Sequence, residues 1–287
     1  MRGIFVSDNI FYHYCSVENF FNIIKSRNLR LCNSYKMNDY MENTYIDVVI
    51  DKSLKKLGVD LNNTNIEKLR RDYKKNKAKW RSYISCLSKS GDALSQWRAY
   101  GDDGQGVAIG FNLSKLNIVD ALKMESSKLE NGINEYKGLS YAEVIYEENK
   151  QLSFIEDIIS NVLKVTQDMD LLRFVIPMVK NSIIFKNPAF SEELEVRLIY
   201  TIDIQEEKRN IYSTSTECRK NFYVKHGQIV SFYELDFGEY VQKGIIDSIV
   251  LGPKCKMAQD DWDVNLFLEQ NKIYMPNGVR ISDASYR

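Results

Sequence analysis

The stretch FYHYCSVENFFNIIKSRNLRLC, residues 11–32, predicts a strand, a helix and a second strand in direct succession. Ser16 offers a side-chain oxygen to the free N–H groups at the start of a helix. Apolar residues then recur at i, i+3, i+4 and i+7, the spacing of one helix face: Val17, Phe20, Phe21 and Ile24. The pattern predicts a helix over residues 17–27, with strands at Phe11–Cys15 and Leu29–Cys32.

Beyond this unit, strands and helices of unequal length follow each other without the regular alternation of a parallel α/β fold. Helices are predicted at 66–80 after the capping-box spacing Thr64–Glu67, at 92–100, at 152–185 with a break or kink at Pro177, and at 259–270. Strands are predicted at Tyr83–Leu87, Val107–Phe111, Glu193–Ile202 and Ile245–Leu251, and a polar loop at Asn33–Asp39. The sequence therefore predicts an α+β fold, and without a visible linker we expect a single domain over residues 1–287.

Composition excludes several classes of protein. Lys plus Arg and Asp plus Glu each number 39, so a globally basic nucleic-acid coat is excluded, although a local basic patch is not. Five cysteines without a CxxC pair, and no signal-like or membrane-spanning apolar run, predict a cytoplasmic protein with reduced thiols and no membrane partner. Two histidines and scattered cysteines argue against a structural zinc site, and no metal is expected.

A pair of carboxylates opens the strand predicted at Glu193–Ile202. Alternation places Glu193, Glu195 and Arg197 on one face, opposite an apolar face. A carboxylate at the start of a strand can stabilise a cation or orient a hydroxyl group. The alternative is a solvated strand face on which the arginine offsets the repulsion between the two glutamates.

Other polar features could have a structural or a functional role. His13 lies on the strand face opposite Tyr12 and Tyr14, as a hydrogen-bonded structural residue or as a ligand-binding one. Ser85 and Ser88 lack the GxSxG context of a hydrolase nucleophile. Residues 101–106, GDDGQG, lead into a strand and are interpreted as a turn. The basic face of the helix predicted at 66–80 contacts either phosphate or solvent.

Several segments, taken in order, resemble the bacterial family known as domain of unknown function 2971. The first, YHYCSVENFFNIIKSRNLRLCNSYKMNDYMENTY, contains Tyr12, His13, Tyr14, the stretch 24–31 and the family-motif residues Asn38, Asp39 and Glu42. The others are YISCLS (83–88), WRAYGDDGQGVAIGF (97–111), FSEELEVRLIY (190–200) and IVLGP (249–253). The resemblance implies a family-like core at about residues 12–253, with a closing helix and strand in 254–287.

The opening strand and helix also resemble those of mono-ADP-ribosyltransferases, in which a strand with a histidine precedes a helix and a Gly-Leu turn. This resemblance implies an ADP-ribosyltransferase-like split mixed sheet with flanking helices. It further implies that NAD is the substrate and that His13 binds the adenosine-side ribose, with Tyr12 and Tyr14 beside it.

The same resemblance implies roles for two later segments. Ser85 and Ser88 correspond to a second motif, and Glu193-Leu194-Glu195 to the third. In that family the last glutamate of the third motif binds the 2′-hydroxyl of the nicotinamide ribose and stabilises the oxocarbenium-like transition state, which makes Glu195 the expected catalytic residue, supported by Glu193 and Arg197. Aromatic residues expected to form a stacking wall for nicotinamide are Tyr12, Tyr14, Tyr35, Trp97 and Tyr100.

Three hypotheses about function follow. The first is an NAD-dependent mono-ADP-ribosyltransferase that modifies nucleic acid or protein, as a toxin or phage-defence effector with an antitoxin or operon partner. The second is a metal-dependent nuclease that uses Asp39, Glu42 and Glu195 as oxygen ligands. The third is a non-catalytic sensor module that binds a nucleotide or nucleic acid without turnover.

Overall fold

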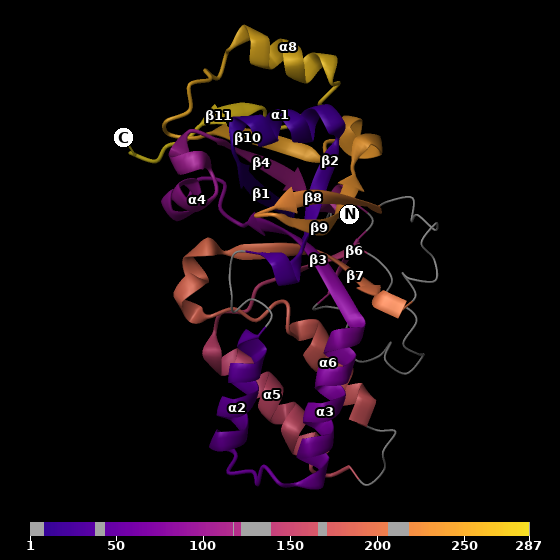
Figure 1. Cartoon of the computed structure of the whole chain (residues 1–287). Coiled ribbons are helices and arrows are strands. Elements are labelled where there is room, and N and C mark those ends of the chain that lie inside the picture. The colour runs from indigo at the N-terminus through magenta and orange to yellow at the C-terminus, as the bar shows by residue number, and fades with distance from the viewer. Residues whose placement is uncertain are drawn as a thin grey trace, which may run out of the picture.

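The computed structural model describes residues 9–37, 44–116, 118–121, 139–165, 171–205 and 218–286. Within these ranges the strands form one mixed sheet with helices at both ends (Figure 1). The strands are β1 (Ile10–Cys15), β2 (Asn28–Asn33), β3 (Trp80–Ser88), β4 (Val107–Asn112), β5 (Val119–Asp120), β6 (Leu139–Glu143), β7 (Glu195–Asp203), β8 (Cys218–Lys225), β9 (Gln228–Asp236), β10 (Ile246–Leu251) and β11 (Val279–Ile281). The α+β class predicted from the sequence is confirmed.

The sheet branches at β3. Strand β7 pairs with β3 from Trp80 to Ser88 and so occupies one edge of it completely. Strands β1 and β2 share the other edge, β1 at Ser88 and β2 at Tyr83 and Ile84. The main path runs β11-β10-β4-β1-β3-β2-β9-β8, and β7, β6 and β5 form the side branch. Two pairs, β10 with β11 and β5 with β6, are parallel, and the other pairs are antiparallel.

The helices gather in two groups. They are α1 (Val17–Ser26), α2 (Tyr45–Lys56), α3 (Thr64–Lys79), α4 (Leu94–Ala99), α5 (Glu148–Val162), α6 (Leu172–Asn181) and α8 (Trp262–Gln270). In Figure 1, α2, α3, α5 and α6 form one end of the molecule, and α1 and α8 cover the other end. Short 3₁₀ helices lie in the connections between these elements, at η1 (Ser34–Lys36), η2 (Asp102–Gly104), η3 (Leu113–Lys115), η7 (Pro188–Glu193) and η8 (Gly238–Lys243).

Two apolar cores pack against opposite faces of the branched sheet. Phe20 and Ile24 of α1 pack with Leu87 of β3 in the first core. Ile84 of β3, on the other face, packs with the four-helix group in the second core. Because side chains of a strand alternate between faces, odd-numbered residues of β3 reach the first core and even-numbered residues the second. This alternation decides which predicted site residues can meet.

Local signals placed most elements correctly. The side chain of Ser16 accepts a hydrogen bond from the Asn19 N–H at the start of α1, as its cap role predicts. The loop predicted at 33–39 instead begins with η1, since the Asn33 side chain accepts from the Tyr35 N–H. The helix predicted at 152–185 is two helices, α5 and α6, and α6 continues through Pro177 with Val175 and Met178 buried, so the expectation of a break at that residue is wrong. Tertiary packing outweighs the local cost of proline here.

Among the described residues, no helix combines the length and apolar character needed to cross a bilayer.

The start of α3 gives a first testable prediction. The capping-box spacing predicted that Thr64 caps the first turn of α3. In the structure Asn63 is the cap, and its side chain accepts a 3.0 Å hydrogen bond from the Asn65 N–H. We expect Asn63→Ala to lower the free energy of unfolding by about 1 kcal/mol, since a backbone donor loses its partner. Urea denaturation measures this, with Thr64→Ala as the matched control; an equal loss in both variants would contradict the assignment.

Candidate active site

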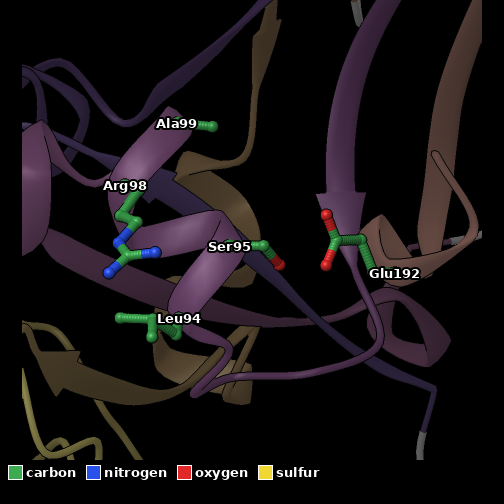
Figure 2. A pocket seen from close by; sticks show the side chains of 5 residues that line it. All are labelled: Leu94, Ser95, Arg98, Ala99 and Glu192. Carbon is green, nitrogen blue, oxygen red and sulfur yellow. The ribbon is translucent and has the colours of Figure 1, made fainter. Parts of the chain in front are cut away.

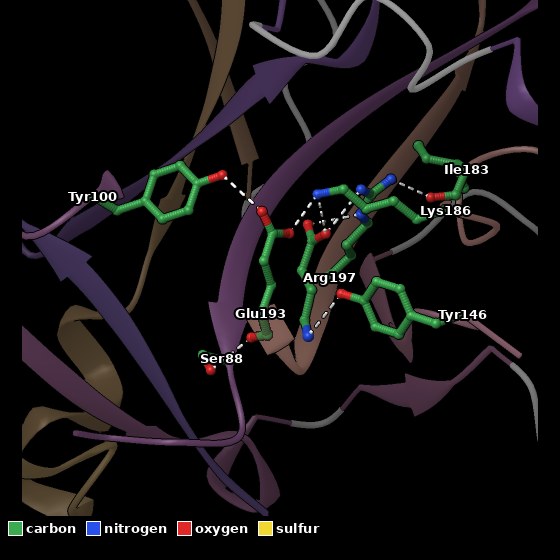
Figure 3. A network of polar contacts seen from close by, with 8 residues as sticks. Ser88, Tyr100, Tyr146, Ile183, Lys186, Glu193 and Arg197 are labelled. Atoms are coloured by element: carbon green, nitrogen blue, oxygen red, sulfur yellow. Dashed lines mark hydrogen bonds and ion pairs between the residues drawn. The ribbon is translucent and has the colours of Figure 1, made fainter. Parts of the chain in front are cut away.

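A buried arginine–carboxylate pair begins β7. Glu195 and Arg197 lie on the same strand face, and their exposed fractions are 4% and 0%. The guanidinium donates to both carboxylate oxygens, from Nε to Oε1 at 2.8 Å and from Nη2 to Oε2 at 3.0 Å. Its Nη1 donates to the backbone carbonyl of Ile183 (Figure 3). This two-pronged geometry is the strongest form of carboxylate–guanidinium pairing.

Lys186 extends the pair toward the surface. Its ammonium donates to Glu195 Oε2 at 3.1 Å and to Glu193 Oε2 at 2.5 Å. The Tyr100 hydroxyl, at the end of α4, donates to the other oxygen of Glu193 at 3.2 Å. A continuous polar chain therefore runs from half-exposed Tyr100 to fully buried Arg197 (Figure 3).

The turn between η7 and β7 separates the two glutamates. Leu194 has φ 46°, a left-handed conformation, and its side chain is 46% exposed. The expectation that β7 begins at Glu193 with Leu194 on its apolar face is therefore wrong. The Ser88 hydroxyl donates to the Glu193 carbonyl at 2.8 Å, and the Glu195 N–H donates to the Tyr146 hydroxyl at 3.2 Å. These bonds fix the turn from both sides, so the two carboxylates meet only through Lys186.

The charges of the network follow from competition between burial and pairing. Burial raises the pKa of Glu195, but Arg197 and then Lys186 outweigh burial and bring that pKa to about 2. Burial lowers the pKa of Lys186, but Glu195 and Glu193 outweigh it and raise that pKa above its ordinary value. Burial, followed by the charge of Glu193, raises the pKa of Tyr100. At neutral pH the carboxylate of Glu195 is therefore ionised, Lys186 is a cation and Tyr100 is a neutral donor.

An open pocket of about 470 Å³ is lined by residues of α4 and η7 (Figure 2). Leu94, Ser95, Arg98 and Ala99 of α4 line one side, and Glu192 of η7 lines the other. Ala99 and Glu192 directly precede Tyr100 and Glu193 in the chain, so the backbone at the exposed end of the network adjoins the pocket, although Tyr100 and Glu193 are not among the lining residues. The pocket offers one guanidinium and one carboxylate to a bound molecule.

His13 does not join this site. Tyr12 pairs with Ser88, and Ser88 with Glu195, so these three residues share a face of the sheet and His13 lies on the other. His13 Nδ1 lies 3.2 Å from the carbonyl oxygen of Cys86. A carbonyl only accepts, so Nδ1 carries the proton, and burial lowers the pKa of the ring and keeps it neutral.

The two predicted serines also separate. Ser85 lies on the His13 face of β3, and its buried hydroxyl has no hydrogen-bond partner. Ser88 lies on the Glu195 face and holds the turn before β7, as described above.

The expected aromatic wall is reduced to one ring. Trp97 is fully buried and donates from Nε1 to Asp92 at 2.7 Å. Tyr14 is buried against it, with 4.7 Å between ring centroids. Tyr12 packs over Gly91, and Tyr35 lies against the guanidinium of Arg81. Tyr14 and Trp97 therefore position α4 from within the core, and Tyr100 remains as the ring at the site.

The remaining candidates are less informative. Asn38, Asp39 and Glu42 lie outside the described residues. Within the described ranges no group of three or more metal-ligating side chains occurs. Reasoning from the sequence missed Lys186 and Tyr146, because each reaches the network through the tertiary fold and neither stands in a local pattern.

The matched family model covers the whole ion network. Residues 96–198 match the model described as Protein of unknown function (DUF2971). This segment runs from α4 to the start of β7 and contains Tyr100, Lys186, Glu193, Glu195 and Arg197. It supports the resemblance to that family over this part of the chain. Comparison with curated proteins and with solved structures gave no match.

Removal of one buried charge should be costly. We expect Glu195→Gln to lower the free energy of unfolding by roughly 3–5 kcal/mol, because the buried Arg197 then loses the carboxylate that pairs with its guanidinium. Glu269→Gln, an exposed substitution on α8, should change it by less than about 0.5 kcal/mol. Urea denaturation of both variants measures the difference, and equal stabilities would exclude a structural role for Glu195.

The same carboxylate predicts an acid-sensitive component of stability. Its pKa falls from 4.5 to about 2 on folding, so its contribution is complete above pH 4.5 and disappears as the pH falls toward about 2. We expect the stability gap between the wild type and Glu195→Gln to shrink across this window. Denaturation series at several pH values test this, and a gap that stays constant between pH 4.5 and 2 would contradict it.

Proposed function

We propose that the chain is an NAD-cleaving, mono-ADP-ribosyltransferase-like enzyme in which Glu193, rather than Glu195, is the carboxylate at the reacting centre. The observation that carries this proposal is the position of Glu193. Its side chain is 14% exposed and its chain neighbour Glu192 lines the pocket, whereas the side chain of Glu195 is 4% exposed and paired with Arg197. Glu195 and Arg197 then position Lys186, which in turn orients Glu193.

The chemistry suits this arrangement. Cleavage of the nicotinamide–ribose bond develops positive charge on the sugar as nicotinamide departs with the bonding electron pair. A nucleophile of the acceptor bonds to the same carbon and loses its proton to solvent or to a carboxylate. A fixed carboxylate stabilises such a transition state without reorganisation. Hydrogen bonds from Tyr100 and Lys186 fix Glu193, and Arg98 is positioned in the pocket to pair with a pyrophosphate.

Further support comes from the architecture. The resemblance to ADP-ribosyltransferases implies a split mixed sheet; the mixed sheet of this chain branches at β3, and the Glu-x-Glu segment ends at the start of β7 beside that branch. The proposal assigns no role to His13, which lies on the other face. We place the reaction in the cytoplasm, because a sparse, odd set of five cysteines without a CxxC pair is typical of reduced thiols.

Turnover of adenylate-labelled NAD tests the proposal. The purified protein is incubated with and without RNA, DNA or cell lysate, and both nicotinamide release and label transfer are followed. We expect Glu193→Gln to lower turnover at least about a hundredfold, by loss of transition-state stabilisation, and Arg98→Gln mainly to raise KM. Glu269→Gln serves as the matched control. Full activity of Glu193→Gln, or no release with any acceptor, would overturn the proposal.

One observation favours a second candidate, a module that binds a nucleotide without turnover. The chain pairs both oxygens of Glu195 internally, as in a structural ion cluster. Calorimetry that detects NAD or ADP-ribose binding, abolished by Arg98→Gln and accompanied by no nicotinamide release, would favour this candidate. Metal-dependent nuclease chemistry gains no comparable support from the described residues.

A further inference from the structure

Residues 282–286, which follow β11, are fastened to the start of the helix that lines the pocket. Ser282 Oγ and the Asp283 N–H both donate to the carboxylate of Asp92, at 2.5 Å and 2.7 Å. The same carboxylate accepts from Nε1 of Trp97, a fully buried residue of α4. One carboxylate therefore holds both this segment and α4, so the position of the one depends on that of the other.

Tyr286, in the same segment, contacts the arginine of the pocket. The guanidinium carbon of Arg98 lies 4.7 Å from the centroid of the Tyr286 ring, and Lys254 Nζ lies 4.0 Å from it. The two oxygens of Asp103 accept from the Tyr286 hydroxyl at 2.5 Å and from Lys254 at 2.6 Å. A Cβ added at Gly104 would lie only 3.2 Å from Tyr286 Cδ1, so the ring packs directly on the backbone of this turn. The ring is therefore fixed by contacts with its hydroxyl group and with its carbon atoms.

The turn that carries Asp103 has an uncommon backbone conformation. Asp102 and Asp103 have φ values of 52° and 53°, in the left-handed region that residues other than glycine seldom occupy. Such conformations persist where surrounding contacts hold them, and they gather at functional sites. The bonds from Lys254 and Tyr286 are contacts of this kind, since they fix the Asp103 carboxylate against the ring.

The contact with Tyr286 leaves the hydrogen-bond donors of Arg98 available. Among the described residues Arg98 has no hydrogen-bond or ion-pair partner, and its side chain lines the pocket (Figure 2). A guanidinium that packs on a ring can still donate from its edge, where the N–H groups match phosphate oxygens in pairs. Because an arginine loses side-chain freedom when it binds a ligand, a ring that fixes the guanidinium beforehand lowers the cost of binding.

We propose that Tyr286 is a positioning residue that holds Arg98 in the orientation in which its guanidinium pairs with the pyrophosphate of a nucleotide. This inference rests on the proposed function for the ligand of Arg98, and it adds the residue that orients this arginine. Arg98 contacts the ring and lines the pocket at the same time, so the ring does not draw the guanidinium away from the pocket. Lys254 is paired with Asp103 and is not among the residues that line the pocket, so we assign Arg98 alone to the ligand.

Calorimetry with ADP-ribose, which carries the pyrophosphate and has no nicotinamide to lose, tests this inference. We expect Tyr286→Leu, which replaces the ring by a smaller apolar side chain, to weaken binding about fivefold by loss of the cation–ring contact. Tyr286→Phe retains the ring and should bind ADP-ribose within about twofold of the wild type. In NAD turnover, Tyr286→Leu should raise KM without lowering kcat, and should raise it no further in the Arg98→Gln background, because Tyr286 acts through Arg98.

A second measurement uses the folded wild type and needs no variant of Tyr286. The Nε–H signal of Arg98 in a ¹⁵N–¹H spectrum, assigned by its absence in Arg98→Gln, should be shifted upfield by the ring and should move when ADP-ribose is added. A signal at the position of a free arginine, or one that ADP-ribose leaves unchanged, would contradict the positioning role.

Tyr274→Leu is the matched control, because Tyr274 is 57% exposed and packs beside Gly244, outside this cluster. Its affinity should equal that of the wild type, and thermal melts establish that each variant folds. The inference is overturned if Tyr286→Leu binds as tightly as Tyr274→Leu, if Tyr286→Phe loses as much affinity as Tyr286→Leu, or if ADP-ribose does not bind.

NAD turnover in the same preparations separates this inference from the proposed function. Turnover that Glu193→Gln abolishes, together with ADP-ribose binding that is indifferent to Tyr286, overturns the inference alone. Binding that depends on Tyr286, without release of nicotinamide in the presence of any acceptor, overturns the proposed function and leaves the positioning of Arg98 established.

Discussion

The requirement that a buried charge be paired constrains the centre of this molecule. Arg197 is fully buried, and an unpaired ion at that depth costs several kcal/mol. Glu195 and the carbonyl of Ile183 satisfy its guanidinium, so the register of β7 and the path of the segment before it are fixed together. A shift of β7 by one residue would turn Glu195 and Arg197 into the apolar core that Val196 and Leu198 now fill.

This pairing distinguishes the two carboxylates of the network. Arg197 and Lys186 hold the pKa of Glu195 near 2, and its two oxygens are already engaged. Lys186 has ammonium protons to share and uses one on Glu193, whose other oxygen accepts only from Tyr100 among the bonds of the network. The left-handed Leu194 separates the two glutamates, so that Glu195 is buried in the ion pair and the more exposed Glu193 follows Glu192, which lines the pocket. A Glu-x-Glu spacing alone does not reveal this division of roles.

Prediction from the sequence succeeded where the signal was local. The cap at Ser16 is confirmed, and of the predicted apolar face of α1 the residues Phe20 and Ile24 are buried, whereas Val17 and Phe21 are exposed. Strands β8 and β9 were not predicted. Their apolar residues Phe222, Val224 and Ile229 are exposed, so the usual link between an alternating apolar pattern and a buried core does not hold for them. Lys186 was not predicted as a site residue, because the turn before β7 brings Glu193 and Glu195 to it. Such a tertiary contact leaves no spacing pattern in the sequence. The carboxylates and the arginine of the candidate site could therefore be predicted from the sequence, whereas its lysine could not.

The branch of the sheet also explains the role of His13. Strands β1 and β2 diverge along one edge of β3, and Cys86 lies between their two points of pairing. The His13 ring supplies a hydrogen bond to the Cys86 carbonyl at this position, and it can do so only with the proton on Nδ1. On the opposite face Cys86 is paired in register with Arg197. Cys86 of β3 therefore accepts a hydrogen bond from the His13 ring on one side of the sheet and lies beside the buried ion pair on the other side. A histidine in this position stabilises the branch on which the site is built, and its presence at the start of the chain does not require that it bind a ribose.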